Sequence, residues 1–313
     1  GVDTSTLRQT VATYDPTLAD EVRLSVVVDP PNCQGSGTAL LAALRARQQQ
    51  QQEQPQRQQN ASPSRPNIAL FLLTGGLSLR APQSALPLKC LSTTPAGHTV
   101  LHHKVHHLLA AARRGWAAAA ATCVDPTTCV VHGHDLVWVS AADDLLTFAG
   151  PEPVDWQSVW RDCSTDLGLV ALAHPSHPSL AGNHGVFVVE AEHARRAAEP
   201  GCTGVCVPCS GYVHKPEPAA RSALTHAHPL PSSSTSHILW TDSAYLLTSV
   251  GIAHFLERRP DLAARQTVDA YVDMLAVDGD MLHRQLLLLP TSTFVHIGTI
   301  PEWIGEAQRV ASS

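Results

Sequence analysis

The chain has no block of lysine or arginine residues, and its 313 residues carry a formal net charge of −6. Because a polyanion needs concentrated positive charge on its partner, we expect no DNA or RNA partner. No apolar run approaches the roughly 20 residues that a membrane-spanning helix needs, and residues 1–25 lack a signal-peptide core. We therefore expect a soluble, cytoplasmic protein with no membrane partner.

Cysteine is also scarce, with eight residues in the chain, and in the cytoplasm these thiols would stay reduced. Cys202, Cys206 and Cys209 have the spacing with which radical enzymes hold an iron–sulfur cluster. The three residues lie in a stretch rich in Gly, Pro and Ser, and no run of strand–helix units follows them. An incidental loop is therefore favoured, and an iron–sulfur protein is the weaker alternative.

The sequence contains no internal repeat and no nucleophile elbow, so we assign no Ser-His-Asp triad. Four of its 18 histidines lie close together at His102, His103, His106 and His107. A helix predicted over residues 100–121 would place Lys104 and these histidines largely outside its apolar stripe. Histidines four residues apart could bind zinc, but no acidic general base lies between them. A solvated helix face is the favoured interpretation.

Residues 74–89 carry several residue types that bind phosphate. A strand predicted over residues 68–73 leads directly into this segment, whose candidate residues are Gly75, Gly76, Ser78, Arg80 and Lys89. Glycine lets backbone N–H groups approach phosphate oxygens, arginine binds phosphate through two parallel hydrogen bonds, and lysine adds a compact charge. The segment therefore predicts a nucleoside triphosphate site.

A second glycine loop, Gly35-Ser36-Gly37, follows an apolar strand predicted over residues 24–28 and precedes a helix predicted over residues 38–47. Two strand-to-loop transitions of this kind fit an α/β sheet that binds its ligand at the carboxyl ends of the strands. Taken singly, each loop is more readily explained as an ordinary tight turn.

A magnesium site is the next requirement, because nucleoside triphosphates react as metal complexes and Mg²⁺ prefers carboxylate oxygens. Asp143 is the best candidate, since it follows a strand predicted over residues 136–139. The alternative is that Asp143 or Asp144 caps the following turn.

Hydrophobic residues make up 44% of the chain, enough for a sizeable core, and apolar strand-like runs alternate with helical segments. Several runs are unbroken, as in strands covered on both faces, which predicts a three-layer α/β architecture. Strands are expected at 24–28, 68–73, 136–139, 167–173, 186–189, 238–240, 245–247 and 294–297, and helices at 38–47, 100–121, 249–258, 267–276 and 301–310. The glutamine-rich segment 48–66 is predicted to be a disordered insertion, and segment 191–236 a loop-rich insertion with little regular structure.

Several motifs, which lie in order over about residues 24–310, together resemble the guanylyltransferase part of the fucokinase/GDP-fucose pyrophosphorylase family. They are Val27-Val28-Asp29-Pro30 with Gly35-Ser36-Gly37, Gly75-Gly76-Leu77-Ser78-Leu79-Arg80-Ala81-Pro82 ending at Lys89, Asn183-His184-Gly185-Val186, His214-Lys215-Pro216, and Phe294-Val295-His296-Ile297-Gly298-Thr299 with Glu302. Their breadth makes the resemblance far more specific than either glycine loop.

The resemblance implies one GT-A-like, Rossmann-like nucleotidyltransferase domain over residues 1–313, with a mixed, mostly parallel sheet and helices on both faces. It also implies that GTP and L-fucose 1-phosphate react to give GDP-L-fucose and pyrophosphate without a covalent enzyme intermediate. The chain begins with Gly1 and lacks the sugar-kinase portion of many family members, as a piece of a longer chain would.

The resemblance further implies the roles of individual residues. Nucleotide binding falls to Gly35, Ser36, Gly37, Gly75, Gly76 and Ser78. The catalytic residues would be Arg80, Lys89 and Asp143, with Asp143 as the ligand of a Mg²⁺ cofactor. The sugar 1-phosphate would meet Asn183, His184, Gly185 and Lys215.

The sequence departs from the family pattern at Thr38, Leu88, Ala142 and Ala244, where the family has glycine. Each departure adds a Cβ where we expect backbone close to the ligand. A catalytically impaired nucleotide-sugar binding or regulatory module is therefore kept as the alternative function. In favour of an enzyme, two of the three lysines, Lys89 and Lys215, occupy motif positions, and the third is Lys104.

Overall fold

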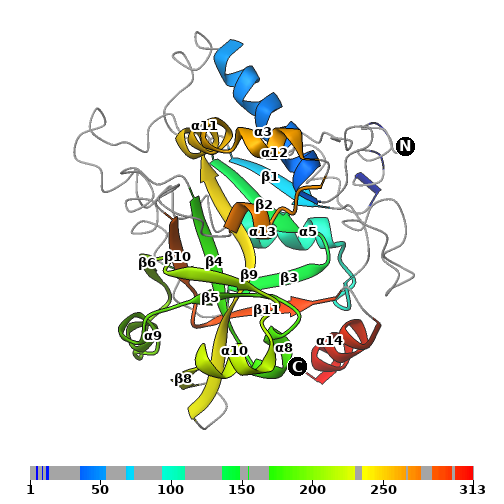
Figure 1. Ribbon diagram of the computed structural model, residues 1–313. Coiled ribbons are helices and arrows are strands. Elements are labelled where there is room, and N and C mark those ends of the chain that lie inside the picture. Colours follow the sequence, from blue (N-terminus) through cyan, green and yellow to red (C-terminus); the bar gives the residue numbers. More distant parts are fainter. Residues whose placement is uncertain are drawn as a thin grey trace, which may run out of the picture.

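The structure is a computed structural model that describes residues 36–53, 68–73, 94–109, 136–148, 154, 169–229, 235–265, 267–275, 284–297 and 300–312, together with isolated residues at 5, 9, 12 and 13. Within this part of the chain, strands and helices alternate along much of the sequence (Figure 1). No helix among the described residues is both long and apolar enough to cross a membrane.

The strands are β1 (Ile68–Leu73), β2 (Leu136–Ala141), β3 (Asp144–Phe148), β4 (Leu169–Ser176), β5 (Gly185–Val188), β6 (Val205–Pro208), β7 (Gly211–His214), β8 (His226–Pro229), β9 (Thr235–Thr248), β10 (Arg284–Leu288) and β11 (Ser292–His296). The helices are α3 (Ser36–Glu53), α5 (Val100–Lys104) with its π-helical continuation η3 (Val105–Leu109), α8 (Pro178–Ala181), α9 (Ala191–Ala197), α10 (Pro218–Ala223), α11 (Ser249–Arg258), α12 (Pro260–Ala264), α13 (Val272–Leu275) and α14 (Ile300–Ser312).

The main sheet has nine strands, with β1-β2-β9-β4-β10-β6 as its central path. Strands β1, β2, β4 and β10 run in one direction. Among the described strands only β1–β2 and β4–β10 pair in parallel, so the prediction that the sheet is mostly parallel is not confirmed. The long strand β9 runs the opposite way between β2 and β4, so most of the strand pairings are antiparallel. The predicted mixed sheet is confirmed, and β3 and β11 form a separate two-stranded sheet.

Both faces of the central sheet are covered, which confirms the three-layer architecture. On one face Val137 and Val139 of β2 join a cluster with buried leucines of α3 and with Phe255 of α11. On the other face Trp138 packs with Leu108 of η3 and Leu146 of β3. Successive side chains of a strand point to opposite faces, so a strand buried on both faces is an unbroken apolar run, as the sequence showed.

Two predicted insertions are corrected by the structure. Segment 191–236 contains helices α9 and α10 and strands β6, β7 and β8, so the prediction of little regular structure is wrong. Among its described residues, Pro208, Pro218 and Pro229 lie at the ends of these short elements, and Pro200, Ser210 and Pro216 lie between them. The glutamine-rich segment is helical as far as Glu53, because α3 continues into it, and residues 54–66 lie outside the described residues.

Other element predictions are confirmed with few changes. Strand β1 and helix α11 have the predicted bounds. The runs at 238–240 and 245–247 belong to one strand, β9, because Thr241 and Asp242 pair with β4 between them and Ser243 lies at a shift in register. The helix predicted over 267–276 is only the short α13. The strand predicted over residues 24–28 lies outside the described residues.

The prediction that Lys104 lies on a solvent-exposed face of the helix beginning at residue 100 is wrong. Its side chain is fully buried and forms an ion pair with Asp144, which is also buried, while its Nζ donates to Ser140 Oγ over 2.7 Å. The histidines beside it stack in pairs along the helix, with ring centroids 4.2 Å apart for His102 and His106 and 4.3 Å apart for His103 and His107. Burial, with the charge of His107, lowers the pKa of His103 to about 4, so this ring is neutral.

Candidate functional site

Asp143 lies in the tight turn between β2 and β3, at the carboxyl end of the β2 strand. Its side chain is 26% exposed, and its backbone carbonyl accepts a hydrogen bond of 2.8 Å from Ile297 N–H. This bond brings the end of β11 against the turn. The position agrees with the expected crevice at the carboxyl ends of the strands.

His296, the last residue of β11, lies between two carboxylates. Its Nδ1 is 2.8 Å from Glu302 Oε2 on α14, and its Nε2 is 3.7 Å from Asp143 Oδ2. Burial alone would lower the pKa of His296, but the two carboxylates outweigh burial and raise it to about 10. The imidazole is therefore a cation at neutral pH, fixed beside Asp143.

His184 is the neutral neighbour of this cation. Its ring meets the rings of Phe294 and His296 edge to face, at centroid distances of 5.1 and 5.4 Å. Burial, followed by the charge of His296, lowers the pKa of His184 to about 4. The pair thus offers a charged and an uncharged imidazole side by side.

Lys215 reaches the same region from the turn after β7. Its backbone N–H donates to the His184 carbonyl over 3.0 Å, and its charge is close enough to lower the pKa of His184 further. Lys215 has a φ of 47°, the one positive φ at a non-glycine position in the described part of the chain. Strain of this kind is often found at functional sites. Asn183, the residue before His184, is exposed.

The structure therefore brings together three of the expected site residues, Asp143, His184 and Lys215. Gly185, expected in the sugar pocket, begins β5 directly after His184 and is buried. The expected phosphate-binding residues Gly35, Gly75, Gly76, Ser78, Arg80 and Lys89 lie outside the described residues.

Ser36 and Gly37, expected to bind nucleotide, contact backbone instead in the described structure. Ser36 Oγ accepts a hydrogen bond of 3.0 Å from Ala270 N–H, and Gly37 N–H donates to the Val268 carbonyl over 2.8 Å. A Cβ on Gly37 would lie 2.5 Å from Val268 Cγ1 and 3.0 Å from the backbone of Asp269. At this position glycine therefore allows the start of α3 to pack closely against the segment before α13.

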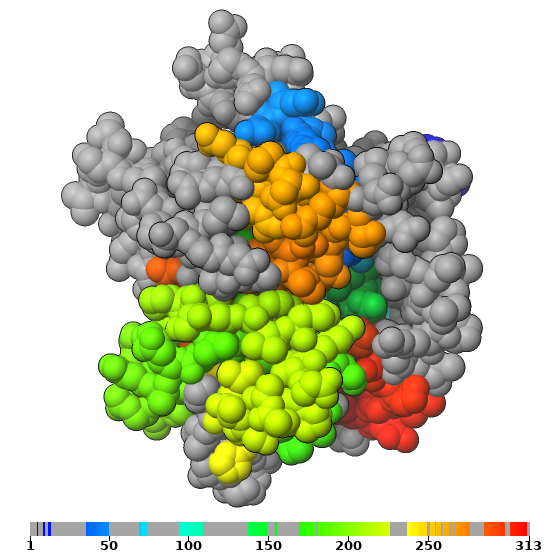
Figure 2. Space-filling view, viewed as in Figure 1, coloured from blue at the N-terminus to red at the C-terminus, as the bar shows by residue number. Residues whose placement is uncertain are grey.

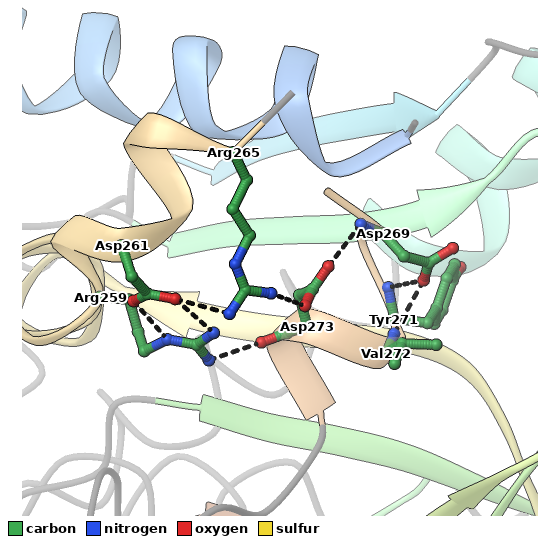
Figure 3. Close-up of polar contacts among 7 residues, drawn as sticks. All are labelled: Arg259, Asp261, Arg265, Asp269, Tyr271, Val272 and Asp273. Atoms are coloured by element: carbon green, nitrogen blue, oxygen red, sulfur yellow. Dashed lines mark hydrogen bonds and ion pairs between the residues drawn. The ribbon is translucent and has the colours of Figure 1, made fainter. Parts of the chain in front are cut away.

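Hydrogen bonds and ion pairs of charged side chains stabilise the segment before α13 (Figure 3). Arg265 donates to both Asp261 and Asp273, each over 2.8 Å, while Arg259 donates to Asp261 and to the Asp273 carbonyl. The carboxylate of Asp269 accepts from the N–H groups of residues 271 and 272, as in a helix cap. The network holds the chain between α12 and α13 in one conformation.

Tyr271, in this segment, is directed toward the centre of the sheet. Its hydroxyl donates to the Ser243 carbonyl over 3.0 Å, and burial, with the charges of Asp144, Asp242 and Asp143, raises its pKa. In the space-filling view, α12 and α13 (orange) adjoin the yellow-green surface of the residues around β7 and α10 (Figure 2). The segment therefore lies on the same face of the molecule as the turn that carries Lys215.

Asp242 is a buried carboxylate on β9 for which no role was predicted. Its Oδ1 accepts from Gly185 N–H over 3.0 Å, and its Oδ2 accepts from the Tyr212 hydroxyl over 2.6 Å. Burial raises the pKa of Asp242 to about 7, with help from Asp144 and Asp269, although both hydrogen bonds lower it.

Replacement of Asp242 by asparagine is expected to change how stability depends on pH. Between the ordinary pKa of 3.8 and a pKa of about 7, the folded protein binds a proton that the unfolded chain releases. The stability from this proton is present at acid pH and is lost as pH rises toward 7, by about 1.4 kcal/mol per pH unit. Asparagine cannot ionise, so it does not lose this stability. The free energy of unfolding of Asp242→Asn, measured relative to wild type, should therefore be about 2 kcal/mol higher at pH 8 than at pH 5. Urea denaturation at both pH values measures this gain, and parallel curves would contradict it.

Among the described residues, no group of three or more His, Cys, Asp or Glu is placed to hold a metal ion. Cys202, Cys206 and Cys209 are all described, so the iron–sulfur alternative is not supported; Cys206 Sγ instead donates to Gln285 Oε1. The zinc alternative for the histidines is likewise not supported. A partly exposed carboxylate such as Asp143 still fits Mg²⁺, which binds through one or two carboxylates plus substrate phosphates.

Two departures from the family pattern prove to be core residues. Ala244 is 1% exposed and packs in the cluster that contains Trp138 and Leu246, and Ala142 is 2% exposed. Their methyl groups are therefore covered by protein. Thr38 is also buried, near the start of α3, and Leu88 lies outside the described residues.

Sequence reasoning missed the roles of Tyr212, Asp242, Tyr271, His296 and Glu302. His296 and Glu302 belong to a quoted motif, which was a usable signal, although no role followed from it. Asp242 lies two residues before Ala244, one of the departures from the family pattern, and no role followed from that. Tyr212 and Tyr271 carry no motif, so their contacts emerge only from the fold.

One family model matches the chain, the fucose pyrophosphorylase domain, over residues 67–280. The match spans β1 to α13 and includes Asp143, His184 and Lys215, whereas His296 and Glu302 follow it. No curated protein shows significant sequence similarity.

Several solved structures resemble the fold. A UDP-glucose pyrophosphorylase complexed with UDP-glucose has a TM-score of 0.47 and 11% identity, with 79% of this chain and 99% of that chain covered. A Thermus thermophilus protein described as mannose-1-phosphate geranyltransferase has a TM-score of 0.45 and 13% identity, with 74% and 76% covered. A UTP-bound UGPase from Acinetobacter baumannii has a TM-score of 0.42 and 13% identity, with 79% and 93% covered.

Proposed function

The chain belongs to the family of fucose pyrophosphorylase domains, and we propose that it joins GTP to L-fucose 1-phosphate, giving GDP-L-fucose and pyrophosphate. Membership of this family makes it a nucleotidyltransferase of the kind that synthesises nucleotide sugars. The finer choice of guanine and fucose rests on the motifs that resemble the fucokinase/GDP-fucose pyrophosphorylase family. The observation that carries the proposal is the meeting of Asp143, His184 and Lys215 at one edge of the fold.

The charges at this edge suit the reaction. An oxygen of the sugar phosphate attacks the α-phosphorus of the nucleotide while pyrophosphate leaves, so the protein has to hold and neutralise phosphates. Lys215 supplies positive charge, whereas the charge of His296 is already offset by Asp143 and Glu302. Neutral His184 with exposed Asn183 offers hydrogen bonds to a sugar. Because the attacking phosphate is already an anion, the reaction needs no general base.

Mg²⁺ would be held by Asp143, whose partly exposed carboxylate lies at the end of β2. When bound, the ion would neutralise the triphosphate and so make pyrophosphate a better leaving group. Arg80 and Lys89 complete the proposal as the phosphate-binding cations of the segment after β1. The remaining expected nucleotide contacts are the glycines and serines of the two loops.

The deciding experiment measures pyrophosphate release for the four common ribonucleoside triphosphates, each paired with the 1-phosphates of fucose, glucose and mannose in the presence of Mg²⁺. GTP with L-fucose 1-phosphate should give the highest rate. Lys89→Met and Asp143→Asn serve as inactive references, and Glu192→Gln, on the exposed face of α9, serves as the matched control. If no pair exceeds the inactive references, the chain is a nucleotide-sugar binding module instead of an enzyme.

Lys215→Met is expected to impair use of the sugar 1-phosphate more than binding of the nucleotide. Loss of a single phosphate-facing cation should lower kcat/KM for the sugar 1-phosphate by about 10²-fold. The KM for the nucleotide should stay within about threefold, because Lys215 is proposed to face the sugar phosphate and not the nucleotide. Arg196→Met, an exposed cation on α9, is the control. Equal losses for both substrates would remove Lys215 from its proposed role.

A further inference from the structure

The proposed sugar-phosphate residues lie at one end of the antiparallel strand pair β5–β7, a hairpin-like unit whose connection contains α9 and β6. Strands β5 and β7 pair antiparallel, from Gly185 opposite His214 to Val188 opposite Gly211. His184 precedes the first of these strands and Lys215 follows the second, and a backbone hydrogen bond of 3.0 Å joins them. Any shift of the hairpin would therefore move both residues together.

The hairpin joins the central sheet through a short contact. The register of β5 against β9 consists of the pair Val186 and Thr241. Such a short ladder fixes position weakly, because each added backbone hydrogen bond contributes only about 1 kcal/mol. Val186 and Phe187 add apolar packing to this contact, and a polar attachment holds the end that carries His184 and Lys215.

Asp242, the next residue of β9, provides that attachment. One carboxylate oxygen accepts from Gly185 N–H on β5, and the other accepts from the Tyr212 hydroxyl on β7. The side chain of Asp242 is 7% exposed, so these bonds form away from water. When Asp242 is ionised, it accepts stronger hydrogen bonds than a neutral acceptor would. A single side chain thus holds both strands of the hairpin.

Gly185 makes this arrangement possible. A Cβ at this position would lie 1.9 Å from the Tyr212 hydroxyl oxygen, so any other residue would displace the tyrosine. The Tyr212 ring is fixed further by Phe187, at a centroid distance of 5.3 Å. Because Gly185, in the Asn-His-Gly-Val motif, has no side chain, it leaves room for the Tyr212 hydroxyl to reach Asp242.

We propose that Tyr212 and Asp242 are positioning residues that hold the β5–β7 hairpin so that Lys215 and His184 face the sugar phosphate. The left-handed backbone of Lys215 supports this role, since a lysine keeps a φ of 47° only where its surroundings impose it. The inference rests on the proposed function for the identity of the ligand, while the attachment of the hairpin stands on the contacts alone.

Tyr212→Phe removes the hydroxyl donor and keeps the ring. Its KM for the sugar 1-phosphate should rise about 10-fold, while the KM for GTP should stay within about twofold. Amide hydrogen exchange in peptides covering residues 183–188 and 211–216 should become about 10-fold faster, and exchange in β10 should not change. Tyr245→Phe is the matched control, because it removes a buried hydroxyl that donates to the Ala270 carbonyl outside the hairpin.

Gly185→Ala is the second variant and should reproduce both effects by displacing the Tyr212 hydroxyl. Unchanged exchange in the hairpin of Tyr212→Phe would overturn the attachment. Faster exchange with an unchanged KM for the sugar phosphate would overturn the link to the substrate. A wild-type protein that releases no pyrophosphate would defeat the proposed function, and the exchange measurement would then decide the attachment alone.

Discussion

Lys104→Met is expected to lower the free energy of unfolding by about 3–5 kcal/mol, because it leaves the buried carboxylate of Asp144 without its cation. Burial already raises the pKa of Asp144, and Lys104 is the main opposing influence. Without Lys104 the Asp144 carboxyl would either take up a proton or stay ionised at a high cost in stability. The loss should therefore be greater at pH 8 than at pH 5.

Urea denaturation and thermal unfolding test this expectation, with a melting temperature lower by roughly 6–15 °C. Arg195→Met, at an exposed position on α9, is the control and should change stability by less than about 0.5 kcal/mol. The double variant Lys104→Met/Asp144→Leu should recover much of the loss, since no unpaired charge remains. A loss below about 1 kcal/mol for Lys104→Met would mean that the ion pair contributes little.

Asp143→Asn is expected to lower kcat/KM for pyrophosphate formation by about 10³-fold, because asparagine is a poor ligand for Mg²⁺ and carries no charge. The variant should also need more Mg²⁺ for half-maximal rate. Steady-state rates over a Mg²⁺ titration measure both effects. Glu192→Gln, which removes one exposed carboxylate far along the chain on α9, should leave both unchanged.

Glu302→Gln separates two explanations of that loss. Asp143 and Glu302 share His296 as a partner, so Asp143→Asn could act by releasing the imidazole instead of a metal ion. Glu302→Gln removes the closer carboxylate from His296 and leaves Asp143 intact. Its kcat/KM should fall far less than that of Asp143→Asn, and its Mg²⁺ requirement should not change. Equal losses in both variants would assign the effect to His296.

Much of the fold followed from the sequence because apolar runs report burial on both faces of a sheet. The runs at 68–73 and 136–139 are β1 and β2, and Asp143 follows β2 as expected. The prediction for segment 191–236 was wrong, because Pro and Ser can end short strands as well as fill loops. The antiparallel insertion of β9 could not be predicted, since strand order depends on pairings distant in sequence.

The candidate site was predictable where a motif named a residue type for a chemical reason. Aspartate at the end of a strand suggested a metal ligand, and the family resemblance implied a role for Lys215. Asp143 and Lys215 do approach the same histidine. The roles of Ser36 and Gly37 were less certain, because a glycine–serine pair serves backbone packing as well as phosphate. Their described contacts with residues 268–270 are of the first kind.

By itself the sequence determined the alternation of strands and helices, the place of Asp143, and a family whose model matches residues 67–280. Only the tertiary structure decided the electrostatic state of its polar groups. Lys104, placed by periodicity on a solvated face, is fully buried against Asp144, and His296 becomes a cation between Asp143 and Glu302. The reason is physical: burial and the proximity of charge set a pKa, and both arise from residues that the fold brings together across long stretches of chain.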